Sequence, residues 1–561
     1  MDNGHWHRRL SRRRVMQSAG IDAAGLTAAA LIACGGGKSS SRTKSSGNTQ
    51  ATSGATTSTG GAAAQPKRGG VFLSGFGNDA PHLDVHTGLW PISDFAGLFH
   101  AQLLQFQPDP SDGDAYKIVP YMAAAMPEQP DNTTYVVKLR PNIKFHNVAP
   151  VNGRAVTAQD VIWSLNRVAA IGMSQQEAAS FLVRSRYNVI DKMEAIDDQT
   201  VRITTKAPSA PFLVYLADAH PSIAPQEMAK PDLKDCRIGC GPFMVADWQR
   251  DVSWDFKKNP DFFMSGYPLL DEYRYTIIKD EAARWAAFKA GQIYDDYVPV
   301  NLVQDAEGDK SVTTVHFGLF DPLVLNINSL PKFAPQNDVR VRRAIALSVN
   351  QQDLVNKLFF GRAKPSGIIP WPMGDWATPV EKLPYYKYDP AQAKQLLQAA
   401  GAEGAKITFN TTTGYAPEDN SAQLIIASLK QTGFNVDAPH YEYSIWVDHN
   451  VKGDYGAYTV WASPQVDPDG LLQSFVTTVS VAGWGTPELD AKIQKQRQTL
   501  DRNERLSLVH EIEMGIADQA WRVGLPNWYQ YVSLQPFVRD NPPNTIWYAN
   551  VRWAYHAWLD K

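Results

Sequence analysis

Two short stretches of this sequence carry side chains suited to contact with a neutral small molecule. Asn410, Thr411 and Thr412 follow the end of a predicted strand and offer hydrogen bonds without charge. In the stretch IIPWPMGDW, Trp371 and Trp376 lie on a predicted loop, where an exposed indole ring could stack on a flat ligand. Packing in a core or beneath a loop is the alternative role for either ring. Both stretches indicate binding rather than a reaction.

The sequence shows no motif typical of a hydrolase. It has no G-x-S-x-G elbow and no H-E-x-x-H, and its carboxylates are plentiful without standing out as a pair. His82 and His86 have the spacing of metal ligands on a helix, but Pro81 and the strand predicted before it favour a loop. We expect no metal and no cofactor, and His82 remains a candidate for lining a ligand cleft.

The N-terminal stretch has the features of an export signal. Arg12, Arg13 and Arg14 follow Ser11 and form a twin-arginine pattern with Val15 and Met16, and residues 21–33 form a short apolar segment. The stretch Leu31-Ile32-Ala33-Cys34 resembles the bacterial lipoprotein box. This resemblance implies that residues 1–33 are a signal peptide and that Cys34 carries the lipid that anchors the protein to the cell membrane.

Composition separates a tether from a folded body. Residues 34–65 are almost entirely Ser, Thr, Gly and Ala after Cys34, so we expect a disordered tether. The whole chain has 561 residues, which is too many for a single core and predicts two or three lobes. A net charge of -3 gives no basic field for nucleic acid. We therefore expect an extracytoplasmic, membrane-anchored monomer.

Cys236 and Cys240 are the only other cysteines. Outside the cytoplasm such a pair predicts a disulfide, with two free thiols as the alternative. The spacing is not C-x-x-C, which argues against redox catalysis.

Strand and helix patterns alternate along the body and would position these residues. Residues 69–74 predict a first strand, and Thr157 with Asp160 resembles a capping box that opens a helix. Asp389 and Pro390 predict the start of another helix. From Asp501 a long helical run places Leu508, Ile512 and Ile516 on one face. The fold class is α/β.

The same body is similar to the family-5 solute-binding proteins of ABC transporters, the dipeptide, oligopeptide and nickel group. The stretch TYVVKLRPNIKFHNVAPVNGRAVTAQDVIWSLNRV resembles the family's signature segment. Further similar stretches follow in the family's order, among them IGCGPFMVADWQ, KNPDFF, YDPAQAKQLLQAAG and GTPELDAKI. Cys240 departs from the pattern, because the family usually has a small residue there.

The resemblance implies a two-lobed periplasmic-binding-protein-like clamp of type II, in its large form. Lobe I would comprise residues 66–328 and 524–561, with an extra subdomain at about 100–212, and lobe II residues 329–523. Two hinge strands, LVLNINS and LPNWYQYVSL, would join the lobes, and the ligand would lie in the cleft between them. Asn527 and Trp528 are on the second of these strands.

The resemblance also selects candidate ligand contacts between residues 441 and 472. In peptide-binding members an aspartate that holds the ligand's ammonium group follows the residue matching Trp461 by three positions; here that residue is Pro464. Asp467 could substitute from a shifted loop, or Asp467-Pro468-Asp469 could be a plain turn. Tyr458 and Tyr443 align near positions that other members occupy with Arg and Trp. The candidates are Tyr443, Tyr458, Trp461, Ser463 and Asp467.

Taken together, these features predict a binding lipoprotein that delivers a small solute to an ABC permease. A peptide is the first expectation, because it is the family's commonest ligand. An oligosaccharide or other neutral solute is the alternative, given Pro464 and the 16 Trp residues. A secreted hydrolase, and a receptor or adhesin that has lost its transporter, are the alternatives from other functional classes.

Overall fold

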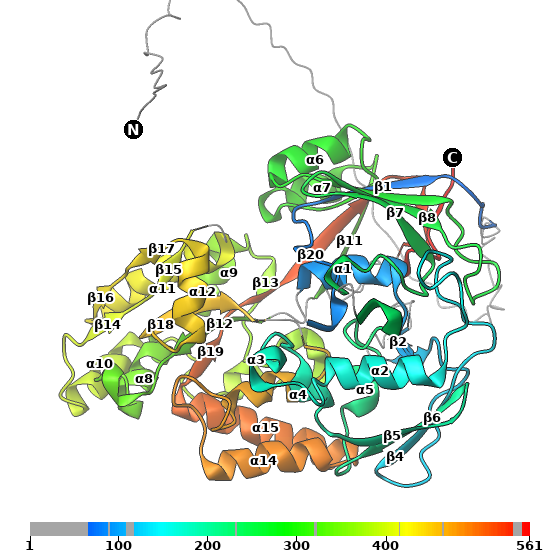
Figure 1. Ribbon diagram of the computed structural model, residues 1–561. Coiled ribbons are helices and arrows are strands. Elements are labelled where there is room, and N and C mark those ends of the chain that lie inside the picture. Colours follow the sequence, from blue (N-terminus) through cyan, green and yellow to red (C-terminus); the bar gives the residue numbers. More distant parts are fainter. Residues whose placement is uncertain are drawn as a thin grey trace, which may run out of the picture. The chain divides into compact units, whose positions relative to one another are not determined.

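The computed structural model describes residues 65–87, 90–107, 117–229, 233–318, 322–413, 416–462, 465–541 and 553–561. The chain forms two compact units, 1–64 and 65–561, and every described residue belongs to the second. The predicted signal peptide, Cys34 and all but the last residue of the predicted tether therefore lie outside the described residues. Helices and strands alternate through the second unit, as the α/β prediction requires (Figure 1). Among the helices in these ranges, none combines the length and the apolar character needed to cross a bilayer.

The N-terminal sheet has four strands in the order β1-β9-β8-β7. Their bounds are Val71–Phe76 for β1, Glu272–Ile277 for β9, Ser253–Lys258 for β8 and Phe243–Gln249 for β7. β1 is parallel to β9, and the other pairs are antiparallel. The predicted first strand is thus confirmed, and a strand from 200 residues further along the chain lies beside it.

A long strand, β20 (Asn527–Leu534), crosses between two groups of elements (Figure 1). Its start pairs with β13 (Ala363–Lys364), whereas the rest pairs with β10 (Asp295–Tyr297) and β11 (Thr313–Gly318). We call β10-β20-β11 the hinge sheet. β20 contains most of the stretch LPNWYQYVSL, which the sequence predicts to be one of two hinge strands.

The central sheet has the order β18-β12-β19. Its strands are β18 (Ala457–Trp461), β12 (Leu323–Ile327) and β19 (Arg522–Gly524), all antiparallel. All five residues of β12 are buried, which explains the continuous apolar run LVLNI apart from one asparagine. β12 contains the other predicted hinge segment.

The remaining strands form smaller sheets: β4 (Thr134–Lys138), β6 (Thr200–Thr205) and β5 (Ile190–Asp197) together; β14 (Lys406–Thr408) with β16 (Asn435–Asp437); β15 (Thr411–Thr412) with β17 (His440–Tyr441); β2 (Leu104–Phe106) with β3 (Ile118–Pro120); and β21 (Val538–Arg539) with β22 (Trp558–Leu559).

The α-helices are α1 (Trp90–Phe99), α2 (Ala158–Val168), α3 (Gln175–Ala178), α4 (Arg184–Tyr187), α5 (Phe212–Leu216), α6 (Glu281–Lys289), α7 (Val303–Gly308), α8 (Val339–Leu347), α9 (Gln351–Leu358), α10 (Pro390–Ala399), α11 (Ala416–Thr432), α12 (Tyr443–Val451), α13 (Pro468–Leu472), α14 (Pro487–Gln498) and α15 (Arg502–Gln519).

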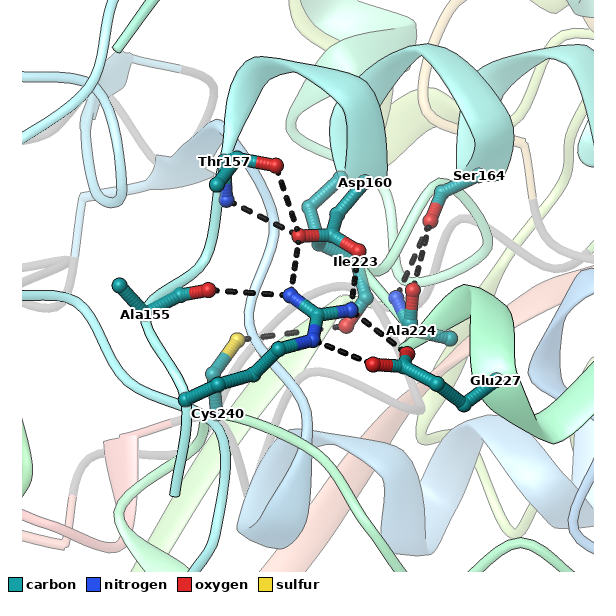
Figure 2. Close-up of polar contacts among 9 residues, drawn as sticks. Ala155, Thr157, Asp160, Ser164, Ile223, Ala224, Glu227 and Cys240 are labelled. Atoms are coloured by element: carbon teal, nitrogen blue, oxygen red, sulfur yellow. Dashed lines mark hydrogen bonds and ion pairs between the residues drawn. The ribbon is translucent and has the colours of Figure 1, made fainter. Parts of the chain in front are cut away.

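The start of α2 has the capping box that the sequence predicts. The Thr157 N–H donates to Asp160 Oδ2 at 2.9 Å, and the same carboxylate is paired with Arg154, whose Nη1 and Nη2 each lie 2.7 Å from it. Arg154 also donates to Glu227, so one guanidinium bridges two carboxylates (Figure 2). The signature segment therefore stabilises a helix start and connects it to the segment at 227.

Two further helix predictions are confirmed at their N-caps. Asp389 accepts the N–H of Gln392 at 2.9 Å at the start of α10, and Asp501 accepts the N–H of Glu504 at 2.8 Å at the start of α15. Leu508, Ile512 and Ile516 of α15 are buried as predicted. These helix starts could be predicted from the sequence because each capping side chain accepts an N–H that lies within one helical turn of it.

Candidate functional site

A cavity of about 490 Å³ opens between elements of the N-terminal, hinge and central sheets. The loop after β1, helix α6 and β10 contribute one wall, and the ends of α9 and β18 contribute another. Residues 528–531 of β20 complete the lining. Its volume is in the range of small-molecule sites, which are preferentially formed where separate parts of a fold meet.

Aromatic rings form much of the cavity wall. The Trp528 ring stacks on Phe359 with centroids 4.9 Å apart, and the Trp461 ring lies 4.4 Å from Trp528 on centroids. Tyr529 and Tyr531 follow on the same strand. Because Phe359 and Trp461 both pack on Trp528, that indole is 8% exposed and serves mainly as a rigid part of the wall.

A buried ion pair lies where α6 and β10 meet the cavity. Arg284 of α6 donates from Nε to Asp296 Oδ1 at 2.7 Å and from Nη1 to the Ile278 carbonyl at 3.2 Å. Burial raises the pKa of Asp296 to about 6, although Arg284 acts in the opposite direction. A Cβ at Gly77 would lie 3.0 Å from Arg284 Nη1, so the glycine leaves room for the guanidinium. This wall therefore offers the cavity positive charge that is partly neutralised.

A carboxylate lies directly behind the aromatic wall. Glu418 of α11 accepts the Trp461 N–H on Oε1 at 3.3 Å, while Oε2 is buried and accepts no hydrogen bond from the described residues. Glu418 is 5% exposed, and burial raises its pKa to about 7. Asn420, two residues along α11, lines the cavity. The main chain of Trp461 thus connects the carboxylate to the cavity wall.

Comparison with known proteins identifies the family. The model for bacterial extracellular solute-binding proteins, family 5, matches residues 117–482, which is more than half of the chain. The chain belongs to this family. Di/tripeptide-binding protein 2 of Pseudomonas aeruginosa is 28% identical over 428 residues, covering 71% of this chain and 78% of that protein. Heme-binding protein A of Haemophilus influenzae is 25% identical over 472 residues, covering 78% and 83%.

Solved structures show the same fold. The periplasmic binding protein DppA of Helicobacter pylori, in complex with the peptide STSA, aligns with a TM-score of 0.75 at 23% identity, covering 88% of this chain and 99% of that one. AgaA of A. tumefacien R10, in complex with agropinic acid, aligns with a TM-score of 0.75 at 24% identity, covering 88% and 99%. The predicted two-lobed, periplasmic-binding-protein-like fold is confirmed.

Of the contacts predicted for this family-5 protein, Trp461 and Trp528 line the cavity. Trp371, at the start of the 3-10 segment Trp371–Trp376, donates from Nε1 to the Asn527 carbonyl at 3.0 Å and packs on Tyr529. Trp371 and Asn527 therefore support the lining of β20 from outside the cavity.

Three polar candidates satisfy the backbone near β15. Asn410 donates to the Asp454 carbonyl at 3.2 Å, Thr411 to the Pro439 carbonyl at 3.1 Å, and Thr412 to the Thr413 carbonyl at 3.1 Å. All three are at most 3% exposed and do not line the described cavity. Ligand contact was predicted from their position after a strand. In the structure, these side chains donate hydrogen bonds to main-chain carbonyls around β15.

Four other candidates also lie away from the described cavity. Trp376 lies under the guanidinium groups of Arg502 and Arg505, at 5.1 and 5.0 Å from its ring centroid. His82 accepts the Asp84 N–H at 3.2 Å in a loop, as predicted from Pro81. Tyr443 stacks on Trp446, and Tyr458 packs edge-on against the same indole. Ser463, with Pro464, lies outside the described residues.

Asp467 does not replace the carboxylate missing at Pro464. It caps α13 by accepting the Asp469 N–H at 2.8 Å, and both of its oxygens pair with Arg505. Asp467 is 4% exposed, and its lone pairs are committed within the protein. Asp467 therefore has a structural role as the N-cap of α13, and Asp467-Pro468-Asp469 begins that helix instead of forming the plain turn that was the alternative.

The expected disulfide is absent from this family-5 protein: Cys236 and Cys240 are both free and buried. The Cys236 thiol points to the Ile238 carbonyl at 3.4 Å, whereas the Cys240 sulfur lies 3.9 Å from Met122 Sδ. The two thiols thus have different partners. Burial raises the pKa of Cys236 to about 11 and that of Cys240 to about 12, so both remain protonated thiols.

No sequence pattern points to several of the residues at the cavity. Arg284 and Asn420 lie on ordinary amphipathic helices, and Phe359 ends another. Glu418 looks like a common first-turn acid of a helix. Only the tertiary arrangement reveals that Arg284, Phe359 and Asn420 line one cavity and that Glu418 lies directly behind its wall. The alternation of side chains along a strand could have identified Tyr529 and Tyr531, because they share a face of β20 with the predicted contact Asn527.

Proposed function

We propose that this protein is the extracytoplasmic binding component of an ABC importer and that it captures short peptides. The observation that carries the proposal is the cavity whose walls come from the N-terminal sheet, the central sheet and the strand β20. Family membership and relatives described as di/tripeptide- and dipeptide-binding proteins support a peptide. A cavity of about 490 Å³ suits a ligand of a few residues.

The ammonium partner of such a peptide is Glu418 in this proposal. Pro464 provides no carboxylate, and Asp467 is committed to Arg505. Glu418 is close to the cavity through Trp461 and retains an unused carboxylate oxygen. A ligand cation that reaches this oxygen would convert a costly buried carboxylate into a charge-assisted pair.

The saccharide alternative draws less support from the geometry. Stacking on a sugar needs an exposed aromatic face, and both Phe359 and Trp461 pack against Trp528. Of the charged side chains that line the cavity, Lys279 is paired with Asp251 and Arg284 with Asp296, whereas Glu281 has no ion pair among the described residues. The carboxylate of Glu281 therefore favours a ligand with a positively charged end.

The predicted boundaries are part of the proposal: lobe I at 66–328 and 524–561 with its subdomain at about 100–212, and lobe II at 329–523. On these boundaries, Tyr215 of the subdomain donates to Asp469 of lobe II at 2.8 Å, and Arg497 of lobe II donates to the Ser185 carbonyl at 2.9 Å. Such contacts would stabilise the closed clamp.

Anchoring belongs to the same proposal. Export through the twin-arginine signal and lipidation of Cys34 would hold the protein beside its permease. Mass spectrometry of the mature chain checks this directly: cleavage before Cys34 and a mass increase from a diacylglycerol are expected. A soluble mature chain cleaved elsewhere would contradict the anchor.

A thermal-shift screen tests the function. The protein is mixed with pools of di-, tri- and tetrapeptides, with the same peptides N-acetylated, and with oligosaccharides. A ligand present at 100 times its dissociation constant stabilises the protein by about 2.7 kcal/mol. We expect a shift with free peptides that N-acetylation removes. A shift with saccharides alone would overturn the peptide assignment, and loss of intact peptide during the assay would indicate an enzyme instead.

A further inference from the structure

Gln530 lies in the middle of β20, in a row of apolar side chains. Because side chains alternate along a strand, Gln530 shares a face of β20 with Trp528 and Val532. Both neighbours belong to the hydrophobic core that also contains Phe72 of β1 and Leu325 of β12. Packing alone would place another apolar side chain between them. A polar residue at this position therefore requires another explanation.

The Gln530 amide is buried, and it has no partner in the described part of the protein. The residue is 9% exposed, and its side chain makes no hydrogen bond to another described residue. Gln351, which is also buried, instead donates from Nε2 to the Ser366 carbonyl at 3.2 Å and accepts the Ser366 N–H on Oε1 at 2.9 Å. A buried amide without a partner raises the free energy of the folded state. Gln530 therefore retains donors and an acceptor for a group from outside the chain.

Such a group can reach Gln530 from the cavity. Gln530 is one of the residues that line the cavity of about 490 Å³. The Trp528 ring, on the same face of β20, forms part of the aromatic wall and contacts the ring of Trp461. A ligand that fills the cavity therefore comes within reach of the Gln530 amide.

Three further carboxamides line the same cavity. They are Asn78 in the loop after β1, Asn301 in the 3-10 segment Val300–Leu302 and Asn420 of α11. None of them makes a side-chain hydrogen bond to another residue in the described part of the chain. Among the charged side chains that line the cavity, Glu281 alone has no ion pair with a described residue. The unpaired polar groups of the cavity are therefore mainly neutral amides.

The chemistry of a carboxamide determines which ligand group complements it. Its oxygen accepts hydrogen bonds and its NH₂ group donates them, whereas a carboxylate only accepts and an ammonium only donates. Another amide offers both a donor and an acceptor at the matching spacing. An extended peptide presents the N–H and the C=O of one residue on the same side, and the side chains of Asn and Gln carry the same two kinds of group.

We propose that Gln530 binds an amide of the transported solute, donating from Nε2 to a C=O and accepting an N–H on Oε1. The inference rests on the proposed function and deepens it, because it names the ligand group that β20 contacts. It does not involve Glu418, so either assignment can fail without the other. The amide belongs either to the main chain of the solute or to one of its side chains. These two sources share the same chemistry, and different peptides separate them.

Gln530→Met replaces the amide with an apolar side chain of nearly the same size. We expect its ligand-free melting temperature to be unchanged or higher, because an unpaired buried amide is removed. Gln351→Met is the matched control: it leaves the N–H and the C=O of Ser366 without their partner, so its melting temperature should fall. If Gln530→Met destabilises the ligand-free protein as much as Gln351→Met does, Gln530 is structural and the inference is wrong. This comparison requires no ligand.

Calorimetry with trialanine and its depsipeptide analogues tests the main chain as the source of the amide. In each analogue an ester oxygen replaces one N–H. If the main chain supplies the amide, one analogue binds the wild type roughly 5-fold more weakly than trialanine does. The same analogue and trialanine then bind Gln530→Met equally well, because the partner of the N–H is gone.

The tripeptides Ala-Gln-Ala and Ala-Met-Ala test a side chain as the source. If a side chain supplies the amide, the wild type binds Ala-Gln-Ala roughly 5-fold more tightly than Ala-Met-Ala, and Gln530→Met binds the two equally.

We expect the wild type and Gln351→Met to show one of these two preferences and Gln530→Met to lose it. A wild type with neither preference, or a preference that Gln530→Met keeps, overturns the inference while the proposed function stands. Absence of binding by every probe counts against the peptide function, and the comparison of melting temperatures then decides whether Gln530 is structural.

Discussion

At the scale of single residues, Glu418 is the side chain whose change gives the clearest result. In Glu418→Gln the amide oxygen can still accept the Trp461 N–H, so the local fold is kept. We expect binding of a peptide with a free N-terminus to weaken roughly 10-fold, because a charge-assisted contact is lost. Calorimetry with the same peptide N-acetylated is the control. Unchanged affinity for the free peptide would contradict the assignment of Glu418.

The raised pKa of Glu418, about 7, also predicts a pH dependence of stability. The unfolded carboxyl ionises near its ordinary pKa, whereas the folded one holds its proton until about pH 7. This group therefore lowers the free energy of unfolding as pH rises between those values, and the loss is complete above about pH 7. At about pH 8, Glu418→Gln should be more stable than the wild type by roughly 2 to 3 kcal/mol, measured by urea unfolding. Equal stability at that pH would show that the carboxylate is compensated.

The two buried thiols give a prediction that distinguishes free cysteines from the expected disulfide. Cys236 and Cys240 are 1% and 0% exposed, and their pKa values are raised by burial. The native protein should not react with a thiol reagent at about pH 8, whereas the denatured, unreduced protein should release both thiols. A denatured protein that reacts only after reduction would instead establish the disulfide.

Residue types alone predicted part of the site. Trp461 and Trp528 were found because each belongs to a strand whose family role could be recognised, and a structural role for Asp467 was recognised as an alternative, although as a turn and not as the cap of α13. Glu418 and Arg284 could not be found, because their significance depends on which partner faces them across the fold. A charge becomes informative only when its counter-ion is known, and the sequence does not contain that information.

At the scale of elements, local signals were the most dependable. The caps of α2, α10 and α15 were predicted correctly because they are made within four residues of chain. Pairings such as β1 with β9, or β12 with β19, join segments about 200 residues apart, and only the structure provides them.

The contact between α5 and α13 provides a test of lobe closure. Tyr215 of α5 donates to Asp469 of α13, and the Asp469 side chain is fully buried. If the two helices belong to different lobes, Tyr215→Phe destabilises only the closed form. Ligand affinity should then fall about 5- to 10-fold, with little change in the ligand-free melting temperature. Tyr187→Phe removes a hydroxyl that donates to the Tyr215 carbonyl within the predicted subdomain. This variant should lower the ligand-free melting temperature and leave the ligand affinity little changed.

At the scale of the whole molecule, buried groups of opposite behaviour set the pH range of stability. Burial lowers the pKa of His86 and His146 to about 4 and that of His100 to about 3. The free energy of unfolding of the protein therefore decreases as pH falls below the pKa that these histidines have in the unfolded chain. Asp295 and Glu513, with pKa values raised to about 7 by burial, act in the opposite sense over the same range.

We therefore expect a nearly flat melting temperature from about pH 6.5 down to about pH 4.5, followed by a fall between about pH 4 and pH 3, where the carboxyl contribution is complete and His100 still binds its proton only in the unfolded state. Glu418→Gln removes one of the opposing carboxyls, so its melting temperature should fall more steeply over the first interval. Differential scanning calorimetry across this range checks both statements. A wild-type protein that loses stability steadily from about pH 6.5 would show that the carboxyls do not offset the histidines.

The strand β20 has a consequence for how such a protein can change over evolution. Its residues line the cavity and at the same time bond to β13, β10 and β11. A mutation there that suits a new cargo also alters the link between neighbouring sheets, so adaptation on this strand is constrained by two demands at once. Glu281 of α6 and Asn420 of α11 line the cavity and pair with no strand among the described residues, so they face only the first demand. We expect descendants with new transport specificities to diverge first on those helices and to keep the strand.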